Sequence, residues 1–233
     1  MKKNNMDEIK EIGDIRIRHP ATISLCGSSF SGKTTLIFRI LDDIEYVMNF
    51  KPTQIYYVYG IWQDRFQHYK DNGSVRFFHG WNHDELEKSA LPRDSLLIID
   101  DSAEMLEDKD WLRSFYTKDS HHLSISIITV FHNVFCRLIP NMRELSQNCM
   151  YTFLTSSKRC YDQIEHFGRQ VFKGGAAKSF LEIYKKICED QPFRYLLIDL
   201  HPLTNSVASL RTNIFRDEQP TVAYVPKLAC GKK

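Results

Sequence analysis

A stretch of eight residues near the start of this 233-residue chain has the residue types and spacing of a phosphate-binding loop. Gly27 to Thr34 fits the pattern G-x-x-x-x-G-K-[ST] without a gap. In such a loop the backbone amides surround phosphate oxygens, the lysine ammonium reaches the outer phosphates, and the final hydroxyl ligates Mg²⁺. Lys33 and Thr34 would perform these last two tasks, provided that a strand precedes the loop and a helix follows it.

The sequence around the loop supplies that context. Residues 21–26 form a largely apolar run typical of a strand, and a helical pattern begins at Gly32, so that a positive helix end would face the phosphates. An accidental match to so short a pattern is the alternative, and the flanking strand and helix argue against it. The predicted nucleotide-binding residues are Gly27, Ser28, Ser29, Phe30, Ser31, Gly32, Lys33, Thr34 and Thr35.

A pair of carboxylates follows a second apolar run. Residues 96–99 lead directly into Asp100 and Asp101, as expected for a strand that is buried on both faces of a parallel sheet. In P-loop NTPases the acidic residue that closes such a strand holds Mg²⁺, which assigns that role to Asp100. The next carboxylate can orient and deprotonate the attacking water, so Asp101 is the candidate general base. The alternative is a solvated acidic turn after a core strand.

Polar residues also end the next apolar run. Residues 124–131 are followed by His132 and Asn133, and a side chain at this place could sense the γ-phosphate, a role that we assign to Asn133. A polar loop that caps a helix is the alternative. His121 and His122 precede the same run, and we interpret them as structural, because two adjacent residues rarely bind one metal ion.

Composition limits the class of protein. Hydrophobic residues make up 42% of the chain, which is typical of a globular protein. The formal net charge is only +2, so a nucleic-acid partner would have to be bound by a local basic patch. The six cysteines are scattered without a C-x-x-C pair, which favours a reducing compartment. With no signal peptide and no apolar run of membrane-spanning length, we expect an intracellular, soluble protein with no membrane partner.

Strand and helix patterns alternate along the chain and predict one α/β domain over residues 20–216. Residues 1–19 would form a lead-in with an edge strand at 15–18, and residues 217–233 a flexible tail. The helix after the phosphate-binding loop should extend to about Met48, and another helix should begin at residues 82–85. Further strands are predicted at 54–59, 75–79, 95–101, 124–131, 150–154, 193–200 and 210–215.

Several of these segments together resemble a known group of proteins. The segments are the phosphate-binding loop, the strand ending in Asp100 and Asp101, and residues 120–135, 143–148, 195–200 and 211–215. The combination resembles the additional-strand P-loop ATPases of the FtsK/HerA superfamily. Within it, the chain is most similar to the DNA-packaging ATPases of Polinton/Maverick-type elements and related large DNA viruses. Two positions depart from the pattern: His132 stands where that family commonly has Gln, and Asp101 where superfamily members often have Glu.

The resemblance implies a fold and a function. The fold would be a RecA-like α/β domain with a mostly parallel sheet, in which the strand ending at His132 separates the P-loop strand from the Asp100 strand. Hydrolysis of ATP with Mg²⁺ would drive double-stranded DNA into a capsid, with a homo-oligomeric ring and a capsid or portal component as partners. Such a protein would work in the host nucleus or cytoplasm or on the capsid. A nucleotide or nucleoside kinase and an ATP-dependent assembly or partitioning protein remain the alternatives.

A ring ATPase commonly completes each site with an arginine from the neighbouring subunit. Along the chain, no arginine lies in the P-loop or beside Asp100 and Asp101. By resemblance to the superfamily, the arginine should lie just before or just after the strand at 150–154, which gives Arg143 and Arg159 as candidates. A surface arginine that makes a weak salt bridge is the alternative for either one.

Overall fold

The computed structural model describes residues 13–81, 86–87, 90–101, 109–135, 142–172 and 176–227. The helix start predicted at residues 82–85 lies outside these ranges. The strands are β1 (Thr22–Cys26), β2 (Ile55–Tyr59), β3 (Arg76–His79), β4 (Ser95–Asp100), β5 (Ile125–Phe131), β6 (Tyr151–Thr155), β7 (Tyr195–Asp199), β8 (Leu210–Thr212) and β9 (Val222–Tyr224).

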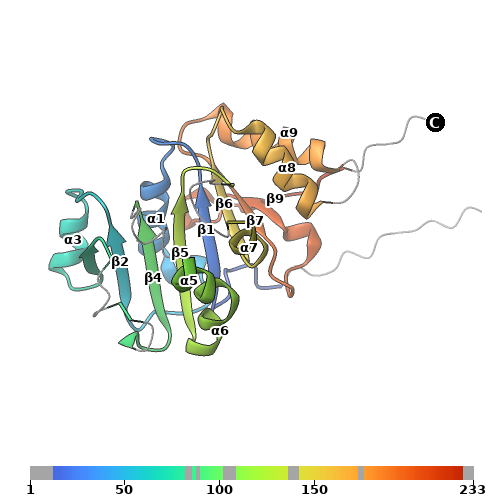
Figure 1. Ribbon diagram of the computed structural model, residues 1–233. Helices are drawn as coiled ribbons and strands as arrows, with labels where there is room; N and C mark the ends of the chain where they lie inside the picture. The colour runs from blue at the N-terminus through green and yellow to red at the C-terminus, as the bar shows by residue number, and fades with distance from the viewer. Residues whose placement is uncertain are drawn as a thin grey trace, which may run out of the picture.

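These strands form one mixed sheet in the order β3-β2-β4-β5-β1-β6-β7-β8-β9 (Figure 1). The pairs from β3 to β6 are parallel, whereas β7, β8 and β9 join antiparallel to their neighbours. The sheet is therefore mostly parallel, as predicted. β5 lies between β4 and β1, so the strand ending at His132 separates the Asp100 strand from the P-loop strand, also as predicted.

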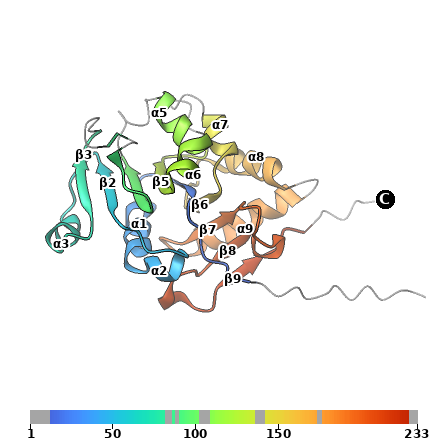
Figure 2. The same cartoon turned by 90° about the horizontal axis from the view of Figure 1, so that it is seen from below.

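Helices cover both faces of the sheet. They are α1 (Lys33–Asp42), α2 (Ile44–Val47), α3 (Phe66–Asp71), α5 (Lys109–Ser114), α6 (Ser120–Leu123), α7 (Met142–Gln147), α8 (Tyr161–Val171) and α9 (Ala176–Asp190), with a π-helical turn η2 (Phe115–Asp119) and 3₁₀ turns η3 (Ser206–Ala208) and η4 (Arg216–Glu218). Figure 2 shows α1 and α2 on one side of the sheet and α5, α7 and α8 on the other. None of the helices described is long and apolar enough to cross a membrane.

The buried strand β4 packs against the helices on both faces of the sheet. Successive side chains of a strand point to opposite faces, so a strand covered on both sides must be apolar throughout. Leu96 and Ile98 pack into the core shared with α1 and α2, and Leu97 and Ile99 into the core shared with α7, α8 and α9. This double burial fixes the carboxyl end of β4, and with it Asp100, between the ends of β2 and β5.

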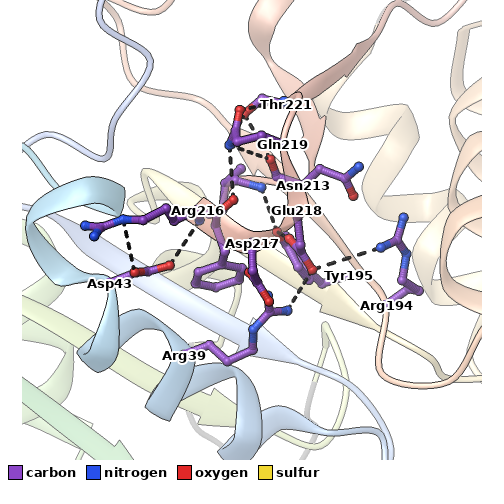
Figure 3. Close-up of polar contacts among 12 residues, drawn as sticks. Arg39, Asp43, Arg194, Tyr195, Asn213, Arg216, Asp217, Glu218, Gln219 and Thr221 are labelled. Carbon is purple, nitrogen blue, oxygen red and sulfur yellow. Dashed lines mark hydrogen bonds and ion pairs between the residues drawn. The ribbon is translucent and has the colours of Figure 1, made fainter.

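The helix that follows the P-loop is shorter than predicted. It ends at Asp42, and Asp43 has a non-helical backbone (φ −108°) before the short helix α2. The Asp43 carboxylate accepts a hydrogen bond from the backbone amide of Arg216 at 3.0 Å, with the Arg216 side chain also close to it (Figure 3). Asp43 therefore joins this helical break to the C-terminal part of the chain.

The C-terminal segment differs from the expected loose tail as far as residue 227. Arg39 of α1 binds the carboxylates of Asp217 and Glu218 at 2.6 and 2.7 Å, and Tyr195 of β7 donates to Glu218 at 2.6 Å (Figure 3). Residues 222–224 add strand β9 to β8. These long-range ion pairs and strand pairings order a segment whose prolines and charges suggested a flexible end.

The lead-in also differs from its prediction. Residues 15–18 do not join the sheet, and only Ile17 makes an isolated parallel bridge, to Met48. The Ile17 amide donates to Val47 and the Ile17 carbonyl accepts from Asn49, while its side chain is buried. The chain at the end of α2 is thus the pairing partner of Ile17.

Candidate functional site

The P-loop connects β1 to α1 and turns at Gly32. Gly32 has a left-handed backbone (φ +91°), and a Cβ there would lie 2.7 Å from a ring carbon of Phe193. Glycine satisfies both constraints, because it has no Cβ and enters this region without strain. The turn lets α1 begin at Lys33, with its first free amides directed at the loop.

Lys33 lies inside the loop. Its Nζ donates to the carbonyl oxygens of Gly27 and Ser28 at 2.9 and 2.8 Å. Burial lowers the pKa of the ammonium, while the charges of Asp100 and Asp101 oppose that shift. An ammonium has three donors, so two hold the loop in shape and one is left for a phosphate oxygen.

The opposite side of the loop is held by β6. Ser31 Oγ and Thr155 Oγ1 are 2.6 Å apart, and Thr155 also donates to the carbonyl of Cys26. A Cβ on Gly27 would lie 1.9 Å from Thr155 Oγ1, so any larger residue there would displace this contact. The loop is therefore fixed by close packing on one side and by the buried ammonium on the other.

The structure brings Thr34 and Asp100 together. Asp100 Oδ2 accepts hydrogen bonds from Thr34 Oγ1 at 3.0 Å and from the Tyr57 hydroxyl at 2.7 Å. Tyr57 was not predicted as a site residue, because a tyrosine within an apolar strand carries no functional signal. Its position follows from the register of β2 beside β4, which places Tyr57 opposite Ile98.

Asp100 is almost fully buried, and burial raises the pKa of its carboxyl group. The hydrogen bonds from Tyr57 and Thr34 oppose that rise, as does the charge of Lys33, whereas Asp101 adds to it. A carboxylate and a hydroxyl in contact are hard oxygen donors of the kind that Mg²⁺ takes at nucleotide sites. The residues present thus fit the predicted Mg²⁺ site, which needs few protein ligands because waters and phosphates supply the rest.

Asp101 lies on the exposed side of the same edge. Its Oδ1 is 3.3 Å from His132 Nε2, and both side chains are 58% exposed. The backbone of Asp101 is left-handed (φ +54°). A Cβ on Gly60 would lie 2.2 Å from the Asp101 carbonyl oxygen, so a glycine at the end of β2 makes room for this turn. Asp101 is therefore reachable by water, as its predicted role requires.

The remaining predicted site residues are Asn133, Arg143 and Arg159, and the described lining of the pocket includes none of them. His132, which follows β5, lines the pocket. Asn133 is half-buried, and its buried Oδ1 has no hydrogen-bond partner within the described chain. Arg143 on α7 and Arg159 after β6 are both exposed. Among the residues described, no three His, Cys, Asp or Glu side chains gather as a metal site. His121 and His122 lie on the short helix α6.

The P-loop, Asp100, Asp101 and His132 surround an open pocket of about 660 Å³. Its described lining residues are Ser29, Phe30, Gly32, Lys33, Thr34, Thr35, Ile61, Gln63, Arg65, Asp100, Asp101, Val130, His132 and Phe193. The lining residues that sequence-based prediction missed include Phe193 and Arg65. Phe193 reaches the loop from the turn before β7, and Arg65 reaches it from the segment before α3. Although no arginine neighbours the motifs in sequence, the fold therefore places one beside the P-loop.

Solved structures with a similar fold include two of the genome packaging NTPase B204 from Sulfolobus turreted icosahedral virus 2. The complex with sulfate has a TM-score of 0.52 at 14% identity, covering 78% of this chain and 92% of B204. The complex with AMPPCP has a TM-score of 0.51 at 14% identity, covering 82% and 96%. EssC (ATPases 2 and 3) from Geobacillus thermodenitrificans has a TM-score of 0.50 at 15% identity, covering 77% of this chain and 37% of that one.

The chain has an α/β, RecA-like P-loop NTPase fold. Sequence comparison finds no matching protein-family model and no matching curated protein. At identities of 14–15% the structural likeness establishes the fold, and the chemistry has to be argued from the residues of the pocket.

Replacing Asp100 with Asn should raise the melting temperature of the ligand-free protein at neutral pH. The pKa of Asp100 is raised on folding, so its contribution to stability is present below the ordinary value of 3.8 and is lost as pH rises through the higher folded pKa. Asn keeps an acceptor for Tyr57 and Thr34 without the buried charge. Differential scanning calorimetry across pH 4 to 8 measures the difference between the two proteins.

The gain should shrink toward the acid end of this range. Asp162→Asn on the exposed surface of α8 is the control, and its melting temperature should follow that of the wild type. A gain for Asp100→Asn that is independent of pH, or no gain at all, would show that the Asp100 charge is not the destabilising feature.

Proposed function

We propose that the protein hydrolyses ATP with Mg²⁺ and uses the energy to translocate double-stranded DNA, packaging a viral or virus-like genome into a capsid. The observation that carries this proposal is the meeting of Lys33, Thr34 and Asp100 at one pocket, with the more exposed Asp101 beside them. Phosphate-binding and water-activating groups at one edge of a parallel sheet are what ATP hydrolysis requires.

The residues of the pocket have separate roles in the proposed hydrolysis. The loop amides and the ammonium of Lys33 bind the phosphates and oppose the negative charge that develops during transfer. Thr34 and Asp100 would hold Mg²⁺, which neutralises phosphate charge when it is bound. Asp101 orients the attacking water and takes its proton. Its contact with His132 couples this carboxylate to the end of β5, where Asn133 would sense the γ-phosphate.

Support for packaging comes from the fold and from the predicted segments together. The genome packaging NTPase B204 shares the fold over most of its length, and its solved complexes include AMPPCP. Of the sequence segments that resemble packaging ATPases, the P-loop, Asp100, Asp101 and the end of β5 line the pocket. We therefore propose double-stranded DNA, a homo-oligomeric ring and a capsid or portal component as partners, and the FtsK/HerA-type packaging ATPases as the family.

Lys33→Ala should abolish both ATP binding and turnover, because it removes the ammonium that binds the phosphates and shapes the loop. Asp101→Asn should retain ATP binding and lower the turnover number by about 10²-fold or more, the scale of general-base removal. Calorimetric titration with a non-hydrolysable ATP analogue and a phosphate-release assay measure the two effects separately.

Lys178→Ala on α9 and Asp162→Asn on α8 are matched controls, since both side chains are exposed and outside the described lining of the pocket. Both should retain binding and turnover. Equal loss of ATP binding in Asp101→Asn and Lys33→Ala would remove Asp101 from the role of general base.

Duplex DNA of any sequence should stimulate the ATPase. A motor that follows the phosphate backbone releases counterions on binding, so with about six phosphate contacts its affinity should fall by about 10³-fold between 50 and 200 mM salt. Steady-state ATPase rates with two duplexes of unrelated sequence, and binding isotherms at several salt concentrations, measure these effects. An ATPase rate that is unchanged by duplex DNA at low salt would instead favour the kinase or the partitioning protein.

In the proposed ring, Arg143 or Arg159 enters the site of the neighbouring subunit. Removing an arginine that acts in this way should lower turnover by about 10³-fold or more. Mixing Lys33→Ala with Arg143→Ala, or with Arg159→Ala, should then restore ATPase activity, because some interfaces combine an intact P-loop with an intact arginine. If mixed oligomers form and neither mixture recovers, neither arginine acts in trans.

A further inference from the structure

Arg65 places a positive charge on the wall of the pocket beside the P-loop. It immediately precedes α3, in the segment that follows β2, and its Nη1 donates to Thr35 Oγ1 at 3.1 Å. Thr35 is the residue after the predicted Mg²⁺ ligand Thr34. Because β2 is the neighbour of β4, the segment after β2 leaves the sheet at the edge that carries Asp100. The guanidinium therefore enters the pocket from the side of the acidic residues.

Among the residues that the structure describes, the contacts of Arg65 hold its charge in place and include no carboxylate. Its guanidinium carbon lies 5.7 Å from the centre of the Phe38 ring, and its hydrogen bond goes to a neutral hydroxyl. The same charge lowers the pKa of the Tyr57 hydroxyl, the group that donates to Asp100, although burial raises that pKa overall. Arg65 thus acts electrostatically on the centre of the site while its guanidinium lies over an aromatic ring.

The negative charges of the pocket leave a role for a cationic side chain in addition to Lys33 and a bound Mg²⁺. Asp100 and Asp101 line it with Lys33, whose ammonium already donates to two loop carbonyls. A nucleoside triphosphate adds several negative charges to that set. Guanidinium presents parallel N–H donors that match phosphate oxygens, which makes arginine better suited to this task than a second lysine.

We propose that Arg65 binds the phosphate chain of the nucleotide within its own subunit, from the segment between β2 and α3. This inference rests on the proposed nucleotide-binding function and adds a phosphate ligand that acts in cis, separate from any arginine of a neighbouring subunit. Its hydrogen bond to Thr35 holds the guanidinium beside the loop, and a bound phosphate oxygen replaces or joins that neutral acceptor. The competing explanation is that Arg65 only covers Phe38.

Three substitutions separate the two explanations. Arg65→Ala removes charge and packing, Arg65→Met keeps an apolar stem over Phe38 without charge, and Arg65→Lys keeps charge without the planar fork. The control is Arg76→Ala, because Arg76 on β3 is exposed, lies 5.9 Å from the ring centre of Tyr56, and is outside the described lining of the pocket.

The measurement is calorimetric titration with the β,γ-methylene analogue of ATP in the presence of Mg²⁺. Arg65→Ala and Arg65→Met should each weaken binding by about 10-fold or more, the scale of a lost charged hydrogen bond, and Arg65→Lys should recover part of the loss. Arg76→Ala should bind like the wild type. Because the contact lies within one chain, the loss should persist at a concentration where sedimentation shows monomers.

The contrary outcomes are distinct. Wild-type affinity in Arg65→Met would show that packing over Phe38 is the whole role, and wild-type affinity in all three variants would remove Arg65 from the site. A loss that disappears in monomers would place the contact between subunits. If the wild type binds no ATP analogue, the proposed function fails as well, whereas binding that is indifferent to Arg65 overturns this inference alone.

Discussion

The buried carboxylate of Asp100 is the constraint on which the rest of the site depends. Two hydroxyls, from Tyr57 on β2 and Thr34 on α1, donate to the same oxygen at the end of β4, so one acceptor joins three elements. Burial disfavours the charge that this carboxylate needs, and the hydrogen bonds offset only part of that cost, since the pKa stays raised. The buried negative charge of Asp100 therefore favours the binding of a cation at this site.

The P-loop is positioned from both sides of β1. On one side Thr155 of β6 packs against the loop so closely that Gly27 has no room for a side chain. On the other, Asp100 holds the start of α1 through Thr34. Further along α1, Arg39 is tied to Glu218 near the end of the described chain. The helix that carries the phosphate-binding residues is thus fixed at its beginning and near its end, by segments far apart in sequence.

Local patterns predicted the parts of the site that are local. The P-loop and the apolar strand ending in Asp100 are readable because residue type and spacing within a few positions determine them. The position of β5 between β4 and β1 was predicted from the resemblance to known ATPases, because local patterns do not determine strand order. Tyr57 and Arg65 could not be predicted, because their contacts depend on which strand lies beside β4. The order of residues 217–227 was missed for a similar reason: the ion pairs of Arg39 and the pairing of β9 with β8 connect distant segments.

A crystal structure with a non-hydrolysable ATP analogue and Mg²⁺ would test the central claim most directly, namely that this edge of the sheet is a nucleotide-hydrolysis site. We expect the outer phosphates to contact the Lys33 ammonium and the loop amides. We expect the metal to lie against the Thr34 hydroxyl on the side of Asp100. A triphosphate bound without contact to Lys33, or a metal away from Thr34 and Asp100, would contradict it.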